Sequence, residues 1–130
     1  MQYKIEVIKN LLNAVYESEF PFTTNIELLN IINNEFGSYQ NEYADAYTKI
    51  LSELNLMKSD ADNFGFERFV SGELICKQTN VYLTYAGQEF IQKLNDKTIW
   101  NKIIKNGASI GLGTLKVLAP CLLTQFVAGL

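Results

Sequence analysis

The side chains that most enzymes use for acid–base, nucleophilic or metal chemistry are scarce in this sequence of 130 residues. It contains no histidine and only two cysteines. The absence of histidine excludes Ser-His-Asp and Cys-His catalysis and histidine-bound metals. Cys76 and Cys121 lie in unrelated contexts, so we expect two free, buried thiols in a reducing cytosol. The sequence therefore predicts a non-enzymatic protein with no catalytic residue, no metal and no cofactor.

One acidic segment comes closest to a metal site. In DADNFG, Asp60, Asp62 and Gly65 occupy positions one, three and six of a calcium-binding loop. The twelfth position, where a bidentate glutamate is expected, is Ser71. We therefore interpret the segment as a solvated acidic loop.

Three glycines near the C-terminus, Gly107, Gly111 and Gly113, could suggest a phosphate-binding loop. No Gly-Lys-Ser/Thr follows them and no strand is predicted before them, so they match neither nucleotide-binding fingerprint. Two interpretations stay open. Gly107 and Gly111 could let two helices approach closely, or the segment is a flexible joint.

Charge is distributed unevenly along the chain. Residues 1–95 contain 7 basic and 13 acidic side chains, a net charge of −6, whereas residues 96–130 contain 4 basic and 1 acidic, a net charge of +3. Nonspecific affinity for nucleic acid rests mainly on Lys and Arg side chains that neutralise phosphates. The acidic body therefore disfavours a phosphate backbone as a partner.

A strand that turns into a helix organises the rest of the chain. Val81 and Leu83 alternate with more polar neighbours as in a half-buried strand, and Thr84 is placed to cap the helix that follows. The apolar positions of this helix are Ala86, Phe90, Ile91 and Leu94. We expect Trp100, just beyond it, to be a packing anchor between this helix and the C-terminal tail.

Hydrophobic periodicity predicts two helices at the start of the chain. The first covers about residues 2–18. Its apolar stripe consists of Ile5, Ile8, Leu12 and Val15. The segment FPF at residues 20–22 breaks this helix, and Thr24 with Glu27 forms a capping box for a second helix over about residues 25–35.

A third helix and a small sheet complete the predicted body. Ser38 or Asn41 can cap the third helix, which ends at Asn55 and is followed by a polar loop at residues 58–63. Three short strands are predicted over residues 64–70, 73–77 and 81–84. The fold class is therefore mainly α with a small antiparallel sheet, in the order of a winged helix-turn-helix body followed by an apolar C-terminal helix.

Two segments carry a resemblance to a known family. LTYAGQEF at residues 83–90 and DKTIWNK at residues 96–102 resemble an uncharacterised family common in prophages and mobile elements, and LSELNL at residues 51–56 extends the likeness to the third helix. The resemblance covers about two thirds of the chain. It implies a winged-helix-like fold and phage ancestry, and it assigns no catalytic residues.

A DNA-binding winged helix reads the major groove with its third helix, whose exposed face should carry Arg, Lys, Asn or Gln. Here we expect that face to present Glu42, Asp45, Thr48, Lys49, Ser52 and Glu53. Three carboxylates against one lysine disfavour docking on DNA. Our alternative hypothesis is nevertheless a DNA-binding transcriptional regulator. Its contacts would be Lys49, Lys97, Lys102 and Lys105.

The last 14 residues, 117–130, contain no charged side chain. A helix over residues 108–130 would be about 34 Å long, enough for a hydrocarbon core of roughly 30 Å. Lys116 near its middle would cost about 2.5 to 3.5 kcal/mol in the bilayer, and Pro120 and Gln125 weaken the case further. A tail-anchored membrane protein is therefore the third hypothesis.

An apolar segment of this length has to be covered by protein or by lipid. Its apolar side chains are spread around the helix, so packing on the body alone would leave some of them exposed. A second copy or another partner would cover the rest. We predict a homo-oligomer through residues 107–130, with a dimer as first choice. The expected interface residues are Ile110, Leu115, Leu118, Leu122, Leu123, Phe126 and Val127.

The favoured interpretation is a phage or prophage protein in the cytoplasm of a bacterial host that acts by binding protein. Inhibition of a host or defence factor is the expected role. Residues 1–96 would form the winged-helix-like domain, and residues 97–130 would form a helical appendage for oligomerisation or docking. An unknown protein partner is favoured over nucleic acid, and nucleic acid over membrane.

Overall fold

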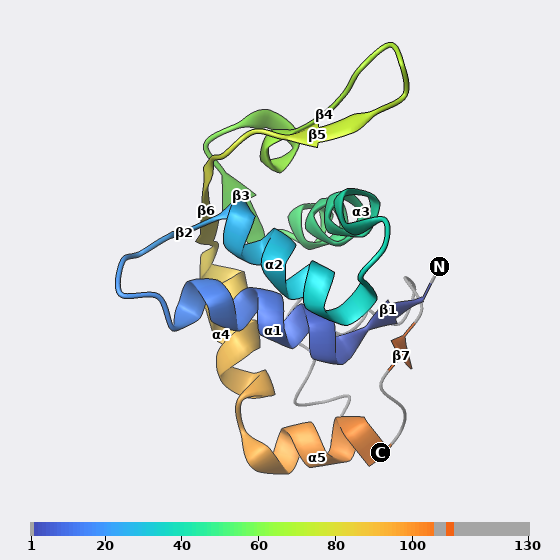
Figure 1. Ribbon diagram of the computed structural model, residues 1–130. Coiled ribbons are helices and arrows are strands. Elements are labelled where there is room, and N and C mark those ends of the chain that lie inside the picture. Colours follow the sequence, from blue (N-terminus) through green and yellow to red (C-terminus); the bar gives the residue numbers. More distant parts are fainter. Residues whose placement is uncertain (1, 106–108, 111–130) are drawn as a thin grey trace.

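The computed structural model describes residues 2–105 and 109–110 (Figure 1). These residues are mainly helical with short antiparallel strands, which confirms the predicted fold class at this level. The helices are α1 (Ile5–Tyr16), α2 (Asn25–Phe36), α3 (Gln40–Glu53), α4 (Tyr85–Leu94) and α5 (Lys97–Lys105), with a short 3-10 turn η1 (Asp62–Gly65). The strands are β1 (Tyr3–Lys4), β2 (Thr23–Thr24), β3 (Met57–Ser59), β4 (Phe66–Arg68), β5 (Leu74–Cys76), β6 (Asn80–Leu83) and β7 (Ser109–Ile110).

Helix α1 is the centre of the core, where it packs on α2, α4 and β6 (Figure 1). All four residues of its predicted apolar stripe are buried. Val7 and Leu11, which lie off that stripe, are buried as well because more than one side of the helix is covered. The helix is shorter than predicted, since residues 3–4 form β1 and the chain turns away after Tyr16.

Strands β2, β6 and β3 form a three-stranded antiparallel sheet in that order. Val81 in β6 is opposite Thr23 in β2, and Tyr82 in β6 is opposite Lys58 in β3. The sequence prediction is wrong about both outer strands, because it places a loop at residues 58–63 and no strand before α2. Strands of two or three residues are too short to show an alternating pattern, so only their pairing with β6 defines them.

Strands β4 and β5 form a separate hairpin, which projects past α3 at the top of Figure 1. Their pairing runs from Phe66 opposite Cys76 to Arg68 opposite Leu74. Both strands are shorter than predicted. Phe64 takes a left-handed φ of 55° within η1, and the extended backbone therefore begins only after this turn.

The ends of α3 differ in how well the sequence predicts them. Tyr39 takes the N-cap position with a φ of 59° and no side-chain hydrogen bond, so capping by Ser38 or Asn41 is wrong. Asn41 instead donates from Nδ2 to the main-chain oxygen of Leu74 in the hairpin (2.8 Å). At the other end, Asn55 follows the helix with a φ of 58°, as expected for a residue that terminates a helix.

Helix α2 begins without the predicted capping box. Thr24 occupies the N-cap position but makes no capping hydrogen bond. The next residue, Asn25, is fully buried, and its Nδ2 donates to the main-chain oxygens of Phe64 (2.8 Å) and Lys77 (2.7 Å). Its Oδ1 accepts from the backbone N–H of Thr79 (3.1 Å). This one side chain therefore ties α2 to η1 and to the chain that leaves the hairpin.

The junction between β6 and α4 forms as predicted. Thr84 Oγ1 accepts a hydrogen bond from the backbone N–H of Gly87 (2.9 Å) and donates one to the main-chain oxygen of Asn55. The backbone N–H of Thr84 donates to the main-chain oxygen of Leu56 (3.1 Å). Thr84 thus caps α4 and also joins it to the end of α3.

Strand β7 pairs with β1, with Ile110 opposite Tyr3 and Ser109 opposite Lys4, and so brings the chain back to the start of α1. A strand at these two positions contradicts a helix that begins near residue 108. The rest of the predicted apolar C-terminal helix, residues 111–130, lies outside the described residues.

Candidate interaction surfaces

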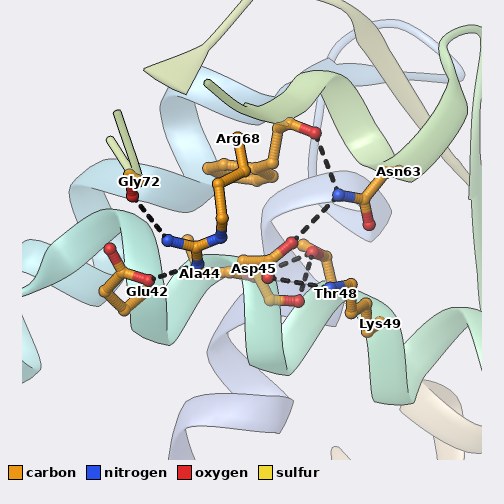
Figure 2. A network of polar contacts seen from close by, with 9 residues as sticks. Glu42, Ala44, Asp45, Thr48, Lys49, Asn63, Arg68 and Gly72 are labelled. Carbon is orange, nitrogen blue, oxygen red and sulfur yellow. Dashed lines mark hydrogen bonds and ion pairs between the residues drawn. The ribbon is translucent and has the colours of Figure 1, made fainter. Parts of the chain in front are cut away.

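A polar network joins η1 to the middle of α3, as Figure 2 shows. Asn63 donates from Nδ2 to Asp45 Oδ1 (3.1 Å) and to the main-chain oxygen of Phe66 (2.9 Å). Lys49 Nζ donates to Asp45 Oδ2 (3.0 Å) one turn further along α3. The Asp45 carboxylate is therefore shared between a lysine of its own helix and an amide of η1, and only 9% of the residue is exposed.

The hairpin is held to the first turn of α3 by a second set of contacts. Arg68 Nη2 donates to Glu42 Oε2 (3.0 Å), and Arg68 Nη1 donates to the main-chain oxygen of Gly72 in the hairpin turn (2.7 Å; Figure 2). The bond from Asn41 to Leu74 also joins the first turn of α3 to the hairpin. One arginine thus fixes the turn of the hairpin and its position over α3.

These contacts correct the predicted exposed face of α3. Thr48 is 1% exposed, and its hydroxyl donates to the main-chain oxygen of Ala44 (2.8 Å), so neither Thr48 nor Asp45 faces solvent. Glu42, Lys49, Ser52 and Glu53 remain exposed. The part of α3 that a DNA reader would present to a groove is therefore partly covered by η1 and by the hairpin.

Most cations of the body are engaged with other side chains of the described chain. The ion pairs are Lys4 with Glu35 (2.9 Å), Lys49 with Asp45 (3.0 Å), Arg68 with Glu42 (3.0 Å) and Lys77 with Glu67 (3.2 Å). The pairs of Lys4, Arg68 and Lys77 join exposed side chains and add little stability. A phosphate would nevertheless have to compete with a carboxylate at each of these cations.

Helix α5 presents three of the four basic side chains of residues 96–130. Lys97, Lys102 and Lys105 are exposed on it. Trp100 is partly buried against the core, and Lys9 Nζ lies 4.1 Å from the centroid of a Trp100 ring, in cation–π geometry. The most buried residue of α5 is Ile103, at 4% exposure, which the sequence analysis did not single out.

The predicted oligomer interface can be placed only in part. Ile110 contributes its backbone to β7. The other six predicted interface residues, and any contact of Trp100 with them, lie outside the described residues. These residues are Leu115, Leu118, Leu122, Leu123, Phe126 and Val127.

The acidic segment DADNFG has structural roles. Asp60 Oδ2 accepts from the Tyr82 hydroxyl (3.1 Å), and Asn63 binds Asp45. Gly65 has a φ of +81°, and a Cβ there would lie 2.2 Å from the main-chain oxygen of Lys77. Within the described chain there is no group of three or more His, Cys, Asp or Glu side chains that could hold a metal ion.

The titratable groups with shifted pKa values have structural explanations. Burial raises the pKa of the Tyr47 phenol and of the Cys76 thiol. The hydrogen bond with Glu35 raises the pKa of Lys4. A raised thiol pKa keeps Cys76, a free and partly buried cysteine, protonated and weakly reactive. Cys121 lies outside the described residues.

An aromatic groove, which the sequence analysis missed, opens between the end of α1, β6 and the first turn of α4. Its volume is about 370 Å³. Its lining includes Tyr16, Phe20, Pro21, Lys58, Tyr82 and Gln88. The feature of the sequence that could have indicated this groove is the FPF segment at residues 20–22, which places two aromatic rings beside a proline in a loop.

The loop that carries these rings has a defined conformation. The Ser18 hydroxyl donates to the main-chain oxygen of Phe22 (2.8 Å) and accepts from the backbone N–H of Phe20 (3.3 Å). The Phe20 and Phe22 rings stack with centroids 5.7 Å apart, and Phe22 lies 5.9 Å from the Tyr82 ring. Phe20 is nevertheless 61% exposed, so the ring array ends in an open aromatic face.

Over residues 2–105 and 109–110, no helix combines the length and the apolar character needed to cross a bilayer. Comparisons of the chain with models of protein families, with curated proteins and with solved structures found no match.

Proposed function

We propose that this chain is a non-enzymatic phage-type protein whose winged-helix-like body acts by binding protein and whose C-terminal segment mediates self-association. The winged-helix part of the proposal is supported by the order α1, β2, α2, α3, β3, hairpin, β6 and by the strand order β2-β6-β3. In this interpretation the segment between β3 and β6 is the wing, and the β4–β5 hairpin lies at its tip. Interference with a host or defence factor is the role that the phage context suggests.

We favour a protein partner over a nucleic acid because cations of the body are already paired with carboxylates. Arg68, the arginine of the hairpin, binds Glu42, and Lys49, the lysine on the exposed face of α3, binds Asp45. Both side chains would meet phosphates if α3 and the hairpin approached a duplex. What the body offers a partner instead is a surface of carboxylates and exposed aromatic rings, among them Phe20 and Tyr39.

A DNA-binding regulator remains the second candidate because of one observation. Lys97, Lys102 and Lys105 are all exposed on a single helix, α5. In this alternative, α5 rather than α3 would supply the phosphate contacts, and the contacts would be independent of sequence.

Self-association can be tested by sedimentation. We expect the full-length protein to sediment as a dimer without detergent and a chain that ends after Ile110 to sediment as a monomer. Ending there retains β7 and its pairing with β1, so the body should still melt cooperatively. A full-length protein that sediments as a monomer would contradict the proposal. A requirement for detergent would favour the membrane hypothesis instead.

A further inference from the structure

The polar side chains that line the aromatic groove, Tyr16, Lys58, Tyr82 and Gln88, are mainly hydrogen-bond donors. Lys58 contributes an ammonium group with three N–H bonds and no acceptor. Tyr16 accepts at its hydroxyl oxygen from Gln92 Nε2 (3.4 Å), which leaves its O–H free to donate. The Gln88 amide supplies two further N–H bonds and one oxygen. A ligand that suits this groove therefore presents carbonyl oxygens and few N–H groups.

An extended peptide that contains prolines has this property. Proline has no backbone N–H, and in the polyproline II conformation its carbonyl oxygens point outward and make no internal hydrogen bonds. Proline rings also pack on flat aromatic faces, and the conformation is already ordered before binding. Phe20 and Tyr82, which both line the groove, supply such faces, and Phe22, outside the lining, packs against both rings. A groove of about 370 Å³ suits a segment of a few residues.

Lys58 is the only charged residue in the lining, and two carboxylates next to lining residues select the flanking residue of the peptide. The Asp60 carboxylate accepts from the Tyr82 hydroxyl, which places it at the polar end of that ring. Glu19 is exposed directly before Phe20 in the loop. These two carboxylates exceed the single charge of Lys58, so a cation beside the prolines is favoured and an anion is disfavoured. The same argument disfavours single-stranded nucleic acid, whose bases could otherwise stack on the rings.

We propose that the aromatic groove formed by Tyr16, Phe20, Tyr82 and Gln88 binds an extended, proline-containing peptide with a lysine or arginine next to the prolines. This inference rests on the proposed function, protein binding, and names the class of partner that the body would recognise. Phe20 supplies the open stacking face, and Asp60 is the expected contact of the flanking cation.

The test uses the full-length protein and three synthetic peptides that differ at one feature each. They are an arginine followed by five prolines, the same peptide with glutamate in place of arginine, and the same peptide with alanines in place of the prolines. Binding is followed by NMR shifts of backbone amides and by calorimetry. We expect the arginine–proline peptide to bind, with shifts at Phe20, Tyr82 and Gln88. The glutamate peptide should bind about threefold more weakly, and the alanine peptide should show no saturable binding.

Matched variants locate the site. Phe20→Ala is expected to weaken binding of the arginine–proline peptide at least tenfold, since it removes the exposed aromatic anchor. Phe69→Ala removes another partly exposed phenylalanine, in the hairpin turn, and should leave binding unchanged. Asp60→Asn should reduce the preference for arginine over glutamate about threefold. Because Phe20 is mostly exposed, its variant should fold like the wild type.

Several outcomes would overturn the inference. Equal binding of the alanine peptide would make the groove a general apolar surface, and loss of binding on Phe69→Ala would move the site to the hairpin. A Phe20→Ala protein that no longer sediments as a dimer would assign the groove to a second copy. If the full-length protein is a monomer but binds the arginine–proline peptide, only the proposed self-association is contradicted. If it is a dimer but binds none of the peptides, only this inference is contradicted.

Discussion

Gly87→Ala is expected to destabilise the protein by about 3 kcal/mol, although the same change inside a helix normally stabilises it by about 1 kcal/mol. A Cβ at this position would lie 1.9 Å from the main-chain oxygen of Leu56 and 2.8 Å from its carbonyl carbon. That part of the backbone cannot easily move, because the N–H of Leu56 donates to the main-chain oxygen of Leu51 (2.9 Å) and its oxygen accepts from Thr84. Helix α4 would therefore have to shift away from the end of α3.

The sign of this effect is its most informative feature. Thermal unfolding of Gly87→Ala should show a midpoint about 10 °C below that of the wild type. Gln88→Ala, at the exposed next position of the same helix, is the matched control and should leave the midpoint nearly unchanged. An increase in stability for Gly87→Ala would mean that α4 does not approach the end of α3 this closely.

Asn25→Ala is expected to destabilise the protein by about 3 to 5 kcal/mol. The side chain is 0% exposed and satisfies three backbone groups, the oxygens of Phe64 and Lys77 and the N–H of Thr79. Truncation leaves one buried and two partly buried groups without this partner, and each unsatisfied buried group costs about 1 to 3 kcal/mol. The loss should release η1 and the base of the hairpin from α2.

Two further substitutions separate the hydrogen bonds from the volume of this side chain. Asn25→Asp keeps the shape but replaces two N–H donors with a charged acceptor that faces two carbonyl oxygens, so it should destabilise at least as strongly. Asn30→Ala, at an exposed position of the same helix, should change the free energy of unfolding by no more than about 0.5 kcal/mol. Chemical denaturation measures all three, and a wild-type stability for Asn25→Asp would contradict the assigned contacts.

Local signals were sufficient for the presence of helices α1 to α4 and for the junction at Thr84. The apolar stripe of α1, the end of α3 at Asn55 and the cap of α4 each depend on residues close in sequence, and all three formed as predicted. The predicted capping box of α2 did not form, although Thr24 takes the N-cap position. At α3, Asn41, whose side chain suits capping, instead contacts Leu74 in the distant hairpin.

The surfaces were harder to predict for the same physical reason. The covering of α3 depends on Asn63 and Arg68, which come from other elements, so the face of the helix could not be read from its own sequence. The aromatic groove combines Phe20 with Tyr82, which is far along the chain, and the FPF segment by itself indicates only a helix break. In α5, the predicted packing anchor is Trp100, whereas Ile103 is the more deeply buried residue.

Binding to duplex DNA tests most directly whether the body is a protein-binding module rather than a DNA reader. Fluorescence anisotropy of labelled random-sequence and operator-like duplexes would be followed with the full-length protein at physiological salt. We expect no saturable binding at micromolar protein, because Arg68 and Lys49 are paired with Glu42 and Asp45. A dissociation constant tighter than micromolar that is lost on Lys49→Glu would show that α3 meets DNA after all, and would contradict the proposed function.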